Sequence, residues 1–329
     1  MIDRVCPAIW VVLILLTSIL FSAHTALPEA PEQFSYNKVK NNIQANDQGA
    51  GDAAHFLREG LGARARGMGG AFVAIGDGVS ASYWNAAGLV QTASVRLEGT
   101  YESRFGGLFD LQYVTGCFSS PPIGVGGAWI HSQPYSVYLL SVAGKLENLS
   151  LGLTGKLYDF SANGEGAHGL GIDVGSLFRI PLSKSELAFG FTSTDIGWSR
   201  IHWQAGGQTA TDRVAWVTRL GTALKGPLPS GGWQCALDLE LAFPRPPRQG
   251  EDDYFSKTLQ ANLALGAEVW FDWIAFRAGL ANINLGEDGG LSLSPSLGLS
   301  VKIEEIGLDI AWTPSLVGQS YLLSVEFRL

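Results

Sequence analysis

The chain has 329 residues, of which 46% are hydrophobic and only 16% are charged, and its formal net charge is −8. A soluble domain has about 25% charged residues, so this composition is unusually apolar, and its acidic balance argues against nucleic acid as a partner. The three cysteines are too few and too widely spaced for a disulfide framework or a cysteine-based zinc site.

Residues 1–26 have the order of a secretory signal peptide. Arg4 supplies a basic start, residues 8–21 form an apolar core, and small residues lead to a cleavage site after Ala26. An uncleaved signal anchor is the alternative interpretation. Residues 27–50 are polar and contain Pro28 and Pro31, and they predict a flexible periplasmic tail.

Residues 51–92 are dense in glycine and alanine, as in GARARGMGGAFVAIGDGVSASYWNAAGL at 62–89. This segment fits neither an amphipathic helix nor a half-buried strand. Its last part, residues 80–89, predicts one short helix with Ser80 as the N-cap and Gly88 near the C-terminus.

From about residue 93 onward, apolar and polar side chains alternate with period two, which gives a β-strand one apolar and one polar face. In residues 233–243, for example, Trp233 and Leu237 share one face, whereas Asp238 and Glu240 lie on the other. About fourteen such segments occur, each about ten residues long, the length of a tilted membrane-spanning strand. The segments are near 93–103, 107–118, 123–132, 135–145, 148–160, 167–180, 185–195, 213–224, 231–243, 258–270, 273–283, 291–302, 305–313 and 319–329.

The connections between these segments alternate in length. They are short at 119–122, 181–184 and 303–304 and longer at 161–166, 196–212, 244–257 and 284–290. Short turns at one end and long loops at the other are typical of outer-membrane barrels and are not expected of a soluble β-sandwich, which is the alternative fold. The predicted fold is therefore all-β, a transmembrane antiparallel β-barrel of about 14 strands over residues 93–329, with both of its ends in the periplasm.

The charged side chains of the predicted strands lie on one face. That face must line the interior, because a charge at mid-bilayer costs about 2–4 kcal/mol. Hairpin geometry predicts three ion pairs across neighbouring strands: Arg219 with Asp238, Glu268 with Arg277, and Lys302 with Asp309. The predicted lumen-facing charges include Arg96, Glu98, Arg219, Asp238, Glu268, Arg277, Lys302 and Asp309.

A barrel of this size is wider than its wall side chains can fill. Residues 51–92 are therefore interpreted as a hatch that folds back into the barrel, with glycines that allow close backbone approach. Its arginines are expected to meet carboxylates of the wall, and Asp77 is expected to meet bases. The candidate hatch residues are Arg58, Arg64, Arg66, Gly67, Gly69, Gly70, Asp77 and Asn85.

The segment EGLGARARGMGGAFVAIGDGVSASYWNAAGL at 59–89 resembles the N-terminal signature of the PorV/PorQ family, which belongs with the FadL-type outer-membrane barrels. Two later segments, LALGAEVWFDWIAFRAGLANIN and SLGLSVKIEEIGLDIAWTP, resemble the last hairpins of that family. The resemblance implies a fourteen-strand barrel with an N-terminal hatch. It also matches Asn85-Ala86-Ala87 to a short Asn-Pro-Ala turn of the FadL hatch. The proline is absent here, so Asn85 is expected to hold this turn by capping or hydrogen bonding.

The resemblance implies two different functions in the bacterial outer membrane. The main interpretation is a barrel of the PorV/PorQ type that receives secreted cargo proteins or docks to a translocon in type IX-like secretion. The alternative is a FadL-like passive transporter of hydrophobic small molecules such as long-chain fatty acids. A barrel with only a structural role is a third option. Outer-membrane lipid and the barrel-assembly machinery are expected partners in every case.

Different features would distinguish these functions. A docking barrel predicts a well-plugged lumen and binding surfaces on loops 196–212 and 244–257, near Trp198, Trp203 and Phe255. A transporter predicts an apolar ligand pocket between hatch and wall, and a lateral opening would fit it.

The sequence predicts no enzyme, no cofactor and no metal site. His55, His131, His168 and His202 are scattered along the chain without metal-ligand spacing. A lipase-like barrel would need a histidine and a serine on its outer face near the membrane edge, but neither His131 nor His202 has a recognisable partner in the sequence.

Overall fold

The computed structural model describes residues 53–91, 93–107, 109–162, 165–205, 208–243, 259–284, 293–314 and 318–329. The predicted signal peptide at 1–26 and periplasmic tail at 27–50 fall outside these ranges. Among the helices in these ranges, none is long and apolar enough to cross a membrane.

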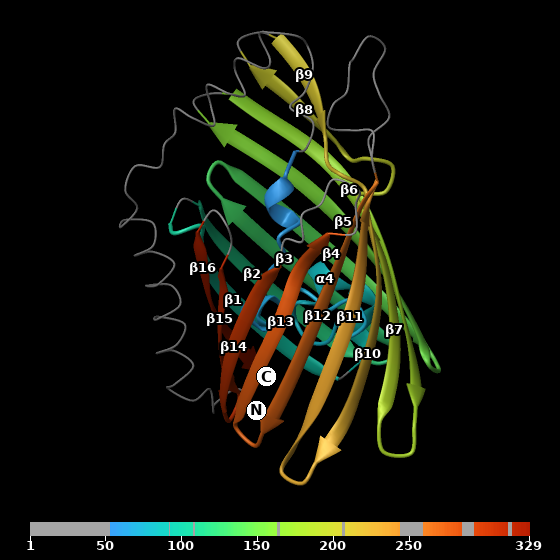
Figure 1. The fold of residues 1–329 in the computed structure, drawn as a ribbon. Helices are drawn as coiled ribbons and strands as arrows, with labels where there is room; N and C mark the ends of the chain where they lie inside the picture. The colour runs from blue at the N-terminus through green and yellow to red at the C-terminus, as the bar shows by residue number, and fades with distance from the viewer. Residues whose placement is uncertain are drawn as a thin grey trace, which may run out of the picture. The chain divides into compact units, whose positions relative to one another are not determined.

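Within the described ranges, sixteen strands form one sheet in which all neighbours are antiparallel. Strand β8 pairs with β6, and β9 pairs with β8, so these two strands lie outside the ring. The other fourteen strands form a closed ring, because β1 pairs with β16 and β5 pairs with β6. Figure 1 shows this ring of tilted strands. The ring strands are β1 (Ser94–Arg104), β2 (Phe109–Ser120), β3 (Ile123–Ser132), β4 (Tyr135–Leu146), β5 (Leu149–Ala162), β6 (Glu165–Pro181), β7 (Glu186–Thr194), β10 (Val217–Leu228), β11 (Gly231–Ala242), β12 (Gln260–Phe271), β13 (Ile274–Asn284), β14 (Ser294–Ile303), β15 (Ile306–Pro314) and β16 (Gln319–Arg328).

The prediction of a closed antiparallel barrel of about fourteen strands is confirmed, and each predicted segment matches one ring strand to within a few residues. The prediction that residues 196–212 form a loop is wrong, because they contain the hairpin β8 (Arg200–Ala205) and β9 (Gln208–Arg213). The cause is the length of β6, whose 17 residues extend beyond β7 and offer a free edge to β8. Loop 244–257 lies outside the described residues.

The two ends of the barrel differ. At the turn end, tight connections at 121–122, 147–148, 229–230, 272–273 and 304–305 join neighbouring strands. At the loop end, the β8–β9 hairpin projects beside β6. In outer-membrane barrels the short turns face the periplasm. The first residue of β1 and the last residue of β16 both lie at the turn end.

The two faces of the wall also differ. Large apolar side chains such as Phe118, Leu140 and Phe276 stand exposed on the outer face. The inner face carries buried polar side chains such as Thr154 and Ser324. Of the predicted lumen-facing charges, Arg96 and Lys302 are half-buried and the other six are buried. An apolar outer band and a polar interior are what a lipid bilayer requires of a barrel.

Within residues 53–91, four short helices precede the barrel: η1 (His55–Leu57), α3 (Ala63–Gly67), α4 (Ala81–Trp84) and η2 (Ala86–Val90). The prediction of one helix over 80–89 differs from the structure, where Asn85 interrupts it with φ −164° and ψ 100°. This extended residue ends α4 and begins η2, because its side chain is used as a cap for the second helix.

Candidate functional site

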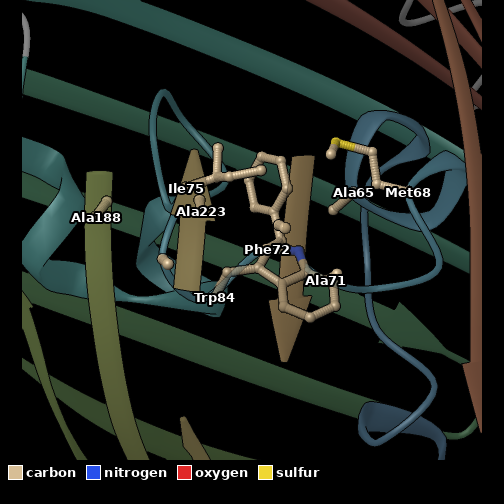
Figure 2. Close-up of a cluster of buried hydrophobic side chains, with 10 residues drawn as sticks. Ala65, Met68, Ala71, Phe72, Ile75, Trp84, Ala188 and Ala223 are labelled. Atoms are coloured by element: carbon tan, nitrogen blue, oxygen red, sulfur yellow. The ribbon is translucent and has the colours of Figure 1, made fainter. Parts of the chain in front are cut away.

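The hatch, described here over residues 53–91, lies inside the barrel. Helix α3 contacts β13, β14, β15 and β16, and helix η2 contacts β2 to β6. Figure 2 shows the apolar centre of the hatch, in which Met68, Phe72 and Trp84 pack toward Ala188 of β7 and Ala223 of β10. Because these wall side chains are small, the aromatic rings of the hatch can lie close to the wall.

Wall glycines bring the two backbones even closer. A Cβ atom at Gly152 of β5 would lie 2.3 Å from the Ala87 backbone nitrogen, and one at Gly279 of β13 would lie 2.2 Å from that of Gly69. Such distances leave no room for any side chain at these positions. Other inner-face glycines whose Cβ atoms would meet the hatch are Gly124, Gly126, Gly175, Gly190, Gly221, Gly266 and Gly298. Glycine within a predicted strand is therefore a sequence signal for close backbone approach.

Arg64 of α3 joins the hatch to the wall through a chain of alternating charges. Its Nη2 atom lies 2.9 Å from Glu268 Oε2, and Glu268 Oε1 lies 2.6 Å from Nε of Arg277. Arg277 then lies 2.9 Å from Asp309. Arg64 also pairs with Asp77 of the hatch itself. Burial opposes ionisation of Asp77, but the charge and hydrogen bond of Arg64, together with the charge of Arg179, outweigh it and lower the pKa of this carboxyl below its usual range.

The other two hatch arginines also meet carboxylates. Arg58 Nη2 lies 3.2 Å from Glu240 Oε1 of β11. Arg66 Nε lies 3.8 Å from Glu102 of β1, and its Nη2 donates to the Thr313 hydroxyl at 3.3 Å. All three predicted hatch arginines are therefore placed against acidic groups of the wall.

The side chain of Asp238 on β11 binds the backbone of the hatch. Its Oδ2 atom accepts the N–H groups of Phe72 at 2.7 Å and of Val73 at 2.8 Å. Two consecutive donors on one carboxylate oxygen form a charge-assisted anchor. The neighbouring inner-face position on β10 is Gly221, which leaves space for this carboxylate.

Asn85 links three parts of the structure. Its Nδ2 atom donates to the carbonyl oxygens of Val73 at 2.9 Å and of Ser176 on β6 at 3.0 Å. Its Oδ1 atom accepts the N–H of Ala87 at 3.2 Å. Asn85 thus takes the hydrogen-bonding role that the sequence resemblance implied, without the proline.

The glycines of the predicted hatch motif have different surroundings. A Cβ at Gly69 would lie 2.8 Å from the Leu280 backbone nitrogen of β13, and one at Gly67 would lie 3.0 Å from Gly298 of β14. Gly70 adopts φ +78°, which favours glycine.

The register of the strands decides which predicted ion pairs form. Glu268 lies directly opposite Arg277, as predicted, with a contact of 2.6 Å. Arg219 instead lies opposite Glu240 and pairs with it at 2.6 Å, whereas Asp238 binds the hatch. The prediction for this hairpin was wrong by two residues, a shift that keeps every side chain on the same face.

The predicted Lys302–Asp309 pair is also shifted by two residues. Asp309 lies opposite Ser300, whose hydroxyl donates to it, and its ion pair is with Arg277. Lys302 lies opposite Gly307. Near the turn end, Arg96 lies 3.5 Å from Glu326, and buried Glu98 accepts the Thr100 hydroxyl at 3.2 Å.

One interior cluster was not found from the sequence. Lys156 of β5 lies 2.8 Å from Asp195 and 2.9 Å from Asp173, and Tyr158 donates to Asp195 at 2.6 Å. Lys156 and Asp173 fall on the polar face of their strands, but Asp195 follows the end of β7, where alternation no longer identifies a face.

The cavities between hatch and wall are small in the described part of the chain. One of about 30 Å³ is lined by Arg58, Lys156 and Asp195, among others. Another, of about 60 Å³, is lined by Arg66, Asp238 and their neighbours. Each has space for a few water molecules at most, and the linings are rich in charge. The apolar pocket between hatch and wall that a transporter predicts is not seen among these residues.

A larger apolar groove of about 590 Å³ lies on the outer face across β10 to β14. Its floor is a row of small side chains, since Cys235 lies opposite Ala267 and Ala267 lies opposite Ala278. Leu237, Leu265 and Leu280 form the next outer-face row on one side, and Leu297, opposite Ala278, stands at one end of the row of small side chains.

Groups of three or more His, Cys, Asp or Glu side chains arranged to hold a metal ion are not found in the described ranges. The sequence predicted no catalytic residue and no cofactor, and both statements stay predictions.

Neither the protein-family models nor the curated proteins give a match to this chain. Solved structures do. The chain is similar to the CymD monoaromatic hydrocarbon channel, with a TM-score of 0.53 and 13% identity over 82% of this chain and 97% of that chain. It is also similar to the P. putida toluene transporter TodX, with a TM-score of 0.49 and 11% identity over 82% of this chain and 97% of that chain.

At such low identity the similarity shows the fold alone. A closed antiparallel barrel with an apolar outer band and a charged interior belongs in a bacterial outer membrane. The PorV/PorQ family assignment stays a prediction.

Proposed function

We propose that this protein is a gated outer-membrane channel for hydrophobic small compounds, the alternative function that the sequence suggested. Its fold is similar to that of a monoaromatic hydrocarbon channel over nearly the whole of that channel. The observation that carries the proposal is the outer groove, since it is apolar, faces lipid and lies against the hatch.

The wall at this groove is built from small residues on both faces. On its outer side the floor is Ala267 and Ala278, and on its inner side the adjacent opposed pair is Gly266 and Gly279. Those glycines touch Met68 and Gly69 of the hatch. The pairing of β12 with β13 is irregular between Leu263 and Leu265, near the same place. A hydrophobic compound that reached the outer face here would meet an apolar surface that continues into lipid.

Beside the hatch, the described residues leave little free space. The described cavities beside the hatch have volumes of about 30 and 60 Å³, which is too small for a benzene-sized compound, since a cavity that binds benzene has about 150 Å³. Transport therefore requires the hatch to shift, and its anchors to the wall set the free energy of that movement.

The test is uptake of a labelled monoaromatic compound or long-chain fatty acid by intact Gram-negative cells that lack their own channel. Cells that produce the protein should take up more label than cells with an empty vector. Ala278→Trp fills the groove floor and should reduce this uptake several-fold. Leu140→Trp, which adds an indole to the exposed outer face of β4, is the matched control and should not. Equal uptake with and without the protein would contradict the proposal.

A secretion barrel remains a second candidate, because one observation favours it. Among the described residues the hatch leaves only small cavities beside the wall, and charged side chains such as Arg58 and Arg219 line them, as a docking barrel predicts. The two functions are separated by isolating the protein in mild detergent and identifying what accompanies it by mass spectrometry. Hydrophobic small molecules would support the channel, whereas secreted proteins or a translocon would support docking and the PorV/PorQ assignment.

A further inference from the structure

Two histidines that are far apart in the sequence are neighbours at the loop end. His168 of β6 lies directly opposite His202 of β8. Both are exposed on the outer face of the sheet, and opposed residues of antiparallel strands have Cβ atoms about 4.5–5.5 Å apart. The same row continues to Asp159 on β5, opposite His168, and to Thr211 on β9, opposite His202.

Each imidazole is oriented by the neighbour on its far side. His168 Nδ1 lies 2.9 Å from Asp159 Oδ1, and His202 Nδ1 lies 3.2 Å from the Thr211 hydroxyl oxygen. A carboxylate can only accept at Nδ1, so Asp159 favours the His168 tautomer that leaves Nε2 as an electron-pair donor, which is how carboxylates prepare histidine ligands in metal sites. The Thr211 hydroxyl can accept from His202 Nδ1 in the same way, which gives that imidazole a free Nε2 lone pair as well.

The second nitrogen of His168 is open to solvent. The His168 side chain is 72% exposed. Its Nε2 atom lies near Gly166, since a Cβ atom added to that glycine would be 3.9 Å from it. Because residue 166 is glycine, it has no side chain that could cover Nε2. The pair lies at the loop end, on the part of β6 that extends beyond its pairing with β7.

We propose that His168 and His202 form a binding site for a divalent transition-metal ion, with one Nε2 ligand from each strand. Two imidazoles suit copper, nickel or zinc, and water completes the coordination. Asp159 and Thr211 are positioning residues. Since a third protein ligand is not found in the described ranges, the affinity should be lower than that of a structural zinc site and should follow the order copper, nickel, zinc as far as geometry permits.

A bound ion would connect the β8–β9 hairpin to the barrel wall. The hairpin is joined to β6 by the short ladder between residues 166–170 and 200–204, and the two imidazoles come from opposite sides of that ladder. Metal binding should therefore make the hairpin more resistant to proteolysis.

The experiment is calorimetric titration of the untagged, detergent-purified protein with copper, nickel and zinc chlorides. Wild type should bind one ion per chain. His168→Asn and His202→Asn should each weaken binding at least tenfold, and Asp159→Asn about tenfold through loss of its orienting bond. His131→Asn is the matched control, because His131 belongs to the same outer face but hydrogen-bonds Ser136 of β4; its affinity should not change.

Retained heat-modifiable gel migration shows that each variant is folded. Unchanged affinity in folded His202→Asn, or an equal loss in folded His131→Asn, would overturn the proposal. A change in proteolysis of the hairpin on adding zinc to wild type, and not to His202→Asn, is a second and independent readout. Neither result depends on whether the barrel transports hydrophobic compounds.

Discussion

The hatch is held in two different ways on its two sides. Toward β2 to β6, helix η2 and its neighbours pack by close apolar contact, with Val79, Leu89 and Val90 buried near Cys117 and Ala143. Toward β11 to β16, Ala63 also packs against Ala311 and Leu322, but ion pairs and hydrogen bonds are added to this packing: Arg58 with Glu240, Arg64 with Glu268, and Asp238 with the hatch backbone.

This difference indicates where a gate would open. Apolar packing does not depend on charge. The η2 side of the hatch should therefore stay in contact with the wall when the ion pairs are weakened. The ionic side has buried charges that must remain paired, and that side also lies behind the outer groove. The predictions below separate the two sides, from the largest expected effect to the smallest.

Glu268→Gln should have the largest effect, because it leaves the buried Arg277 and hatch Arg64 with a weaker partner. Breaking a buried pair in this way costs about 3–5 kcal/mol. The measurement is denaturant unfolding in detergent micelles, followed by tryptophan fluorescence. Arg328→Gln is the control, since the Arg328 side chain is 40% exposed and such pairs contribute about 1 kcal/mol or less. An equal, small effect of both substitutions would show that the ionic side does not hold the hatch.

Gly152→Val tests the apolar side. Its side chain would meet the backbone at Ala86 and Ala87, and overpacking of this kind costs about 1–3 kcal/mol. Gly155→Val on the same strand has open space around it and should be neutral. The readout is the same unfolding experiment. Tolerance of both substitutions alike would mean that the hatch is not in close contact with β5.

Asn85→Ala removes the cap of η2 and two donors to backbone carbonyls. Loss of an N-cap costs about 1 kcal/mol. Ser80→Ala provides the comparison, because Ser80 makes no side-chain cap bond among the described contacts and its replacement should have almost no effect. If Ser80→Ala were the more damaging of the two, the helix boundary at Asn85 would be in error.

The Arg64–Asp77 pair should give the smallest effect, and it should depend on pH. The pKa of Asp77 is lowered in the folded protein, so its stabilising contribution is complete above the ordinary aspartate pKa of about 3.9 and is lost as pH falls below it. Wild type should be more stable than Asp77→Asn at pH 7 and at pH 5, and the difference should disappear in strong acid. A difference that grew on acidification would contradict the assigned sign.

The strands could be predicted from the sequence because alternation directly reports which face of each segment meets lipid. The partners of Arg219 and Asp309 could not, because a register shift of two residues keeps both side chains on the same face. The β8–β9 hairpin was missed because its pairing depends on the extra length of β6 rather than on its own pattern. The resemblance implied a capping or hydrogen-bonding role for Asn85, but its partner Ser176 on β6 is distant in sequence and could not be identified. For the contact of Gly279 with Gly69, glycine within a strand was the signal.

The most direct test of the account is single-channel recording in planar bilayers of the intact protein and of a variant that lacks residues 53–91. If the hatch closes the barrel, the intact protein should be almost silent and the deletion variant should show large, steady conductance, as an empty barrel of this size would. Equal conductance of the two proteins, with both inserted and folded, would contradict it.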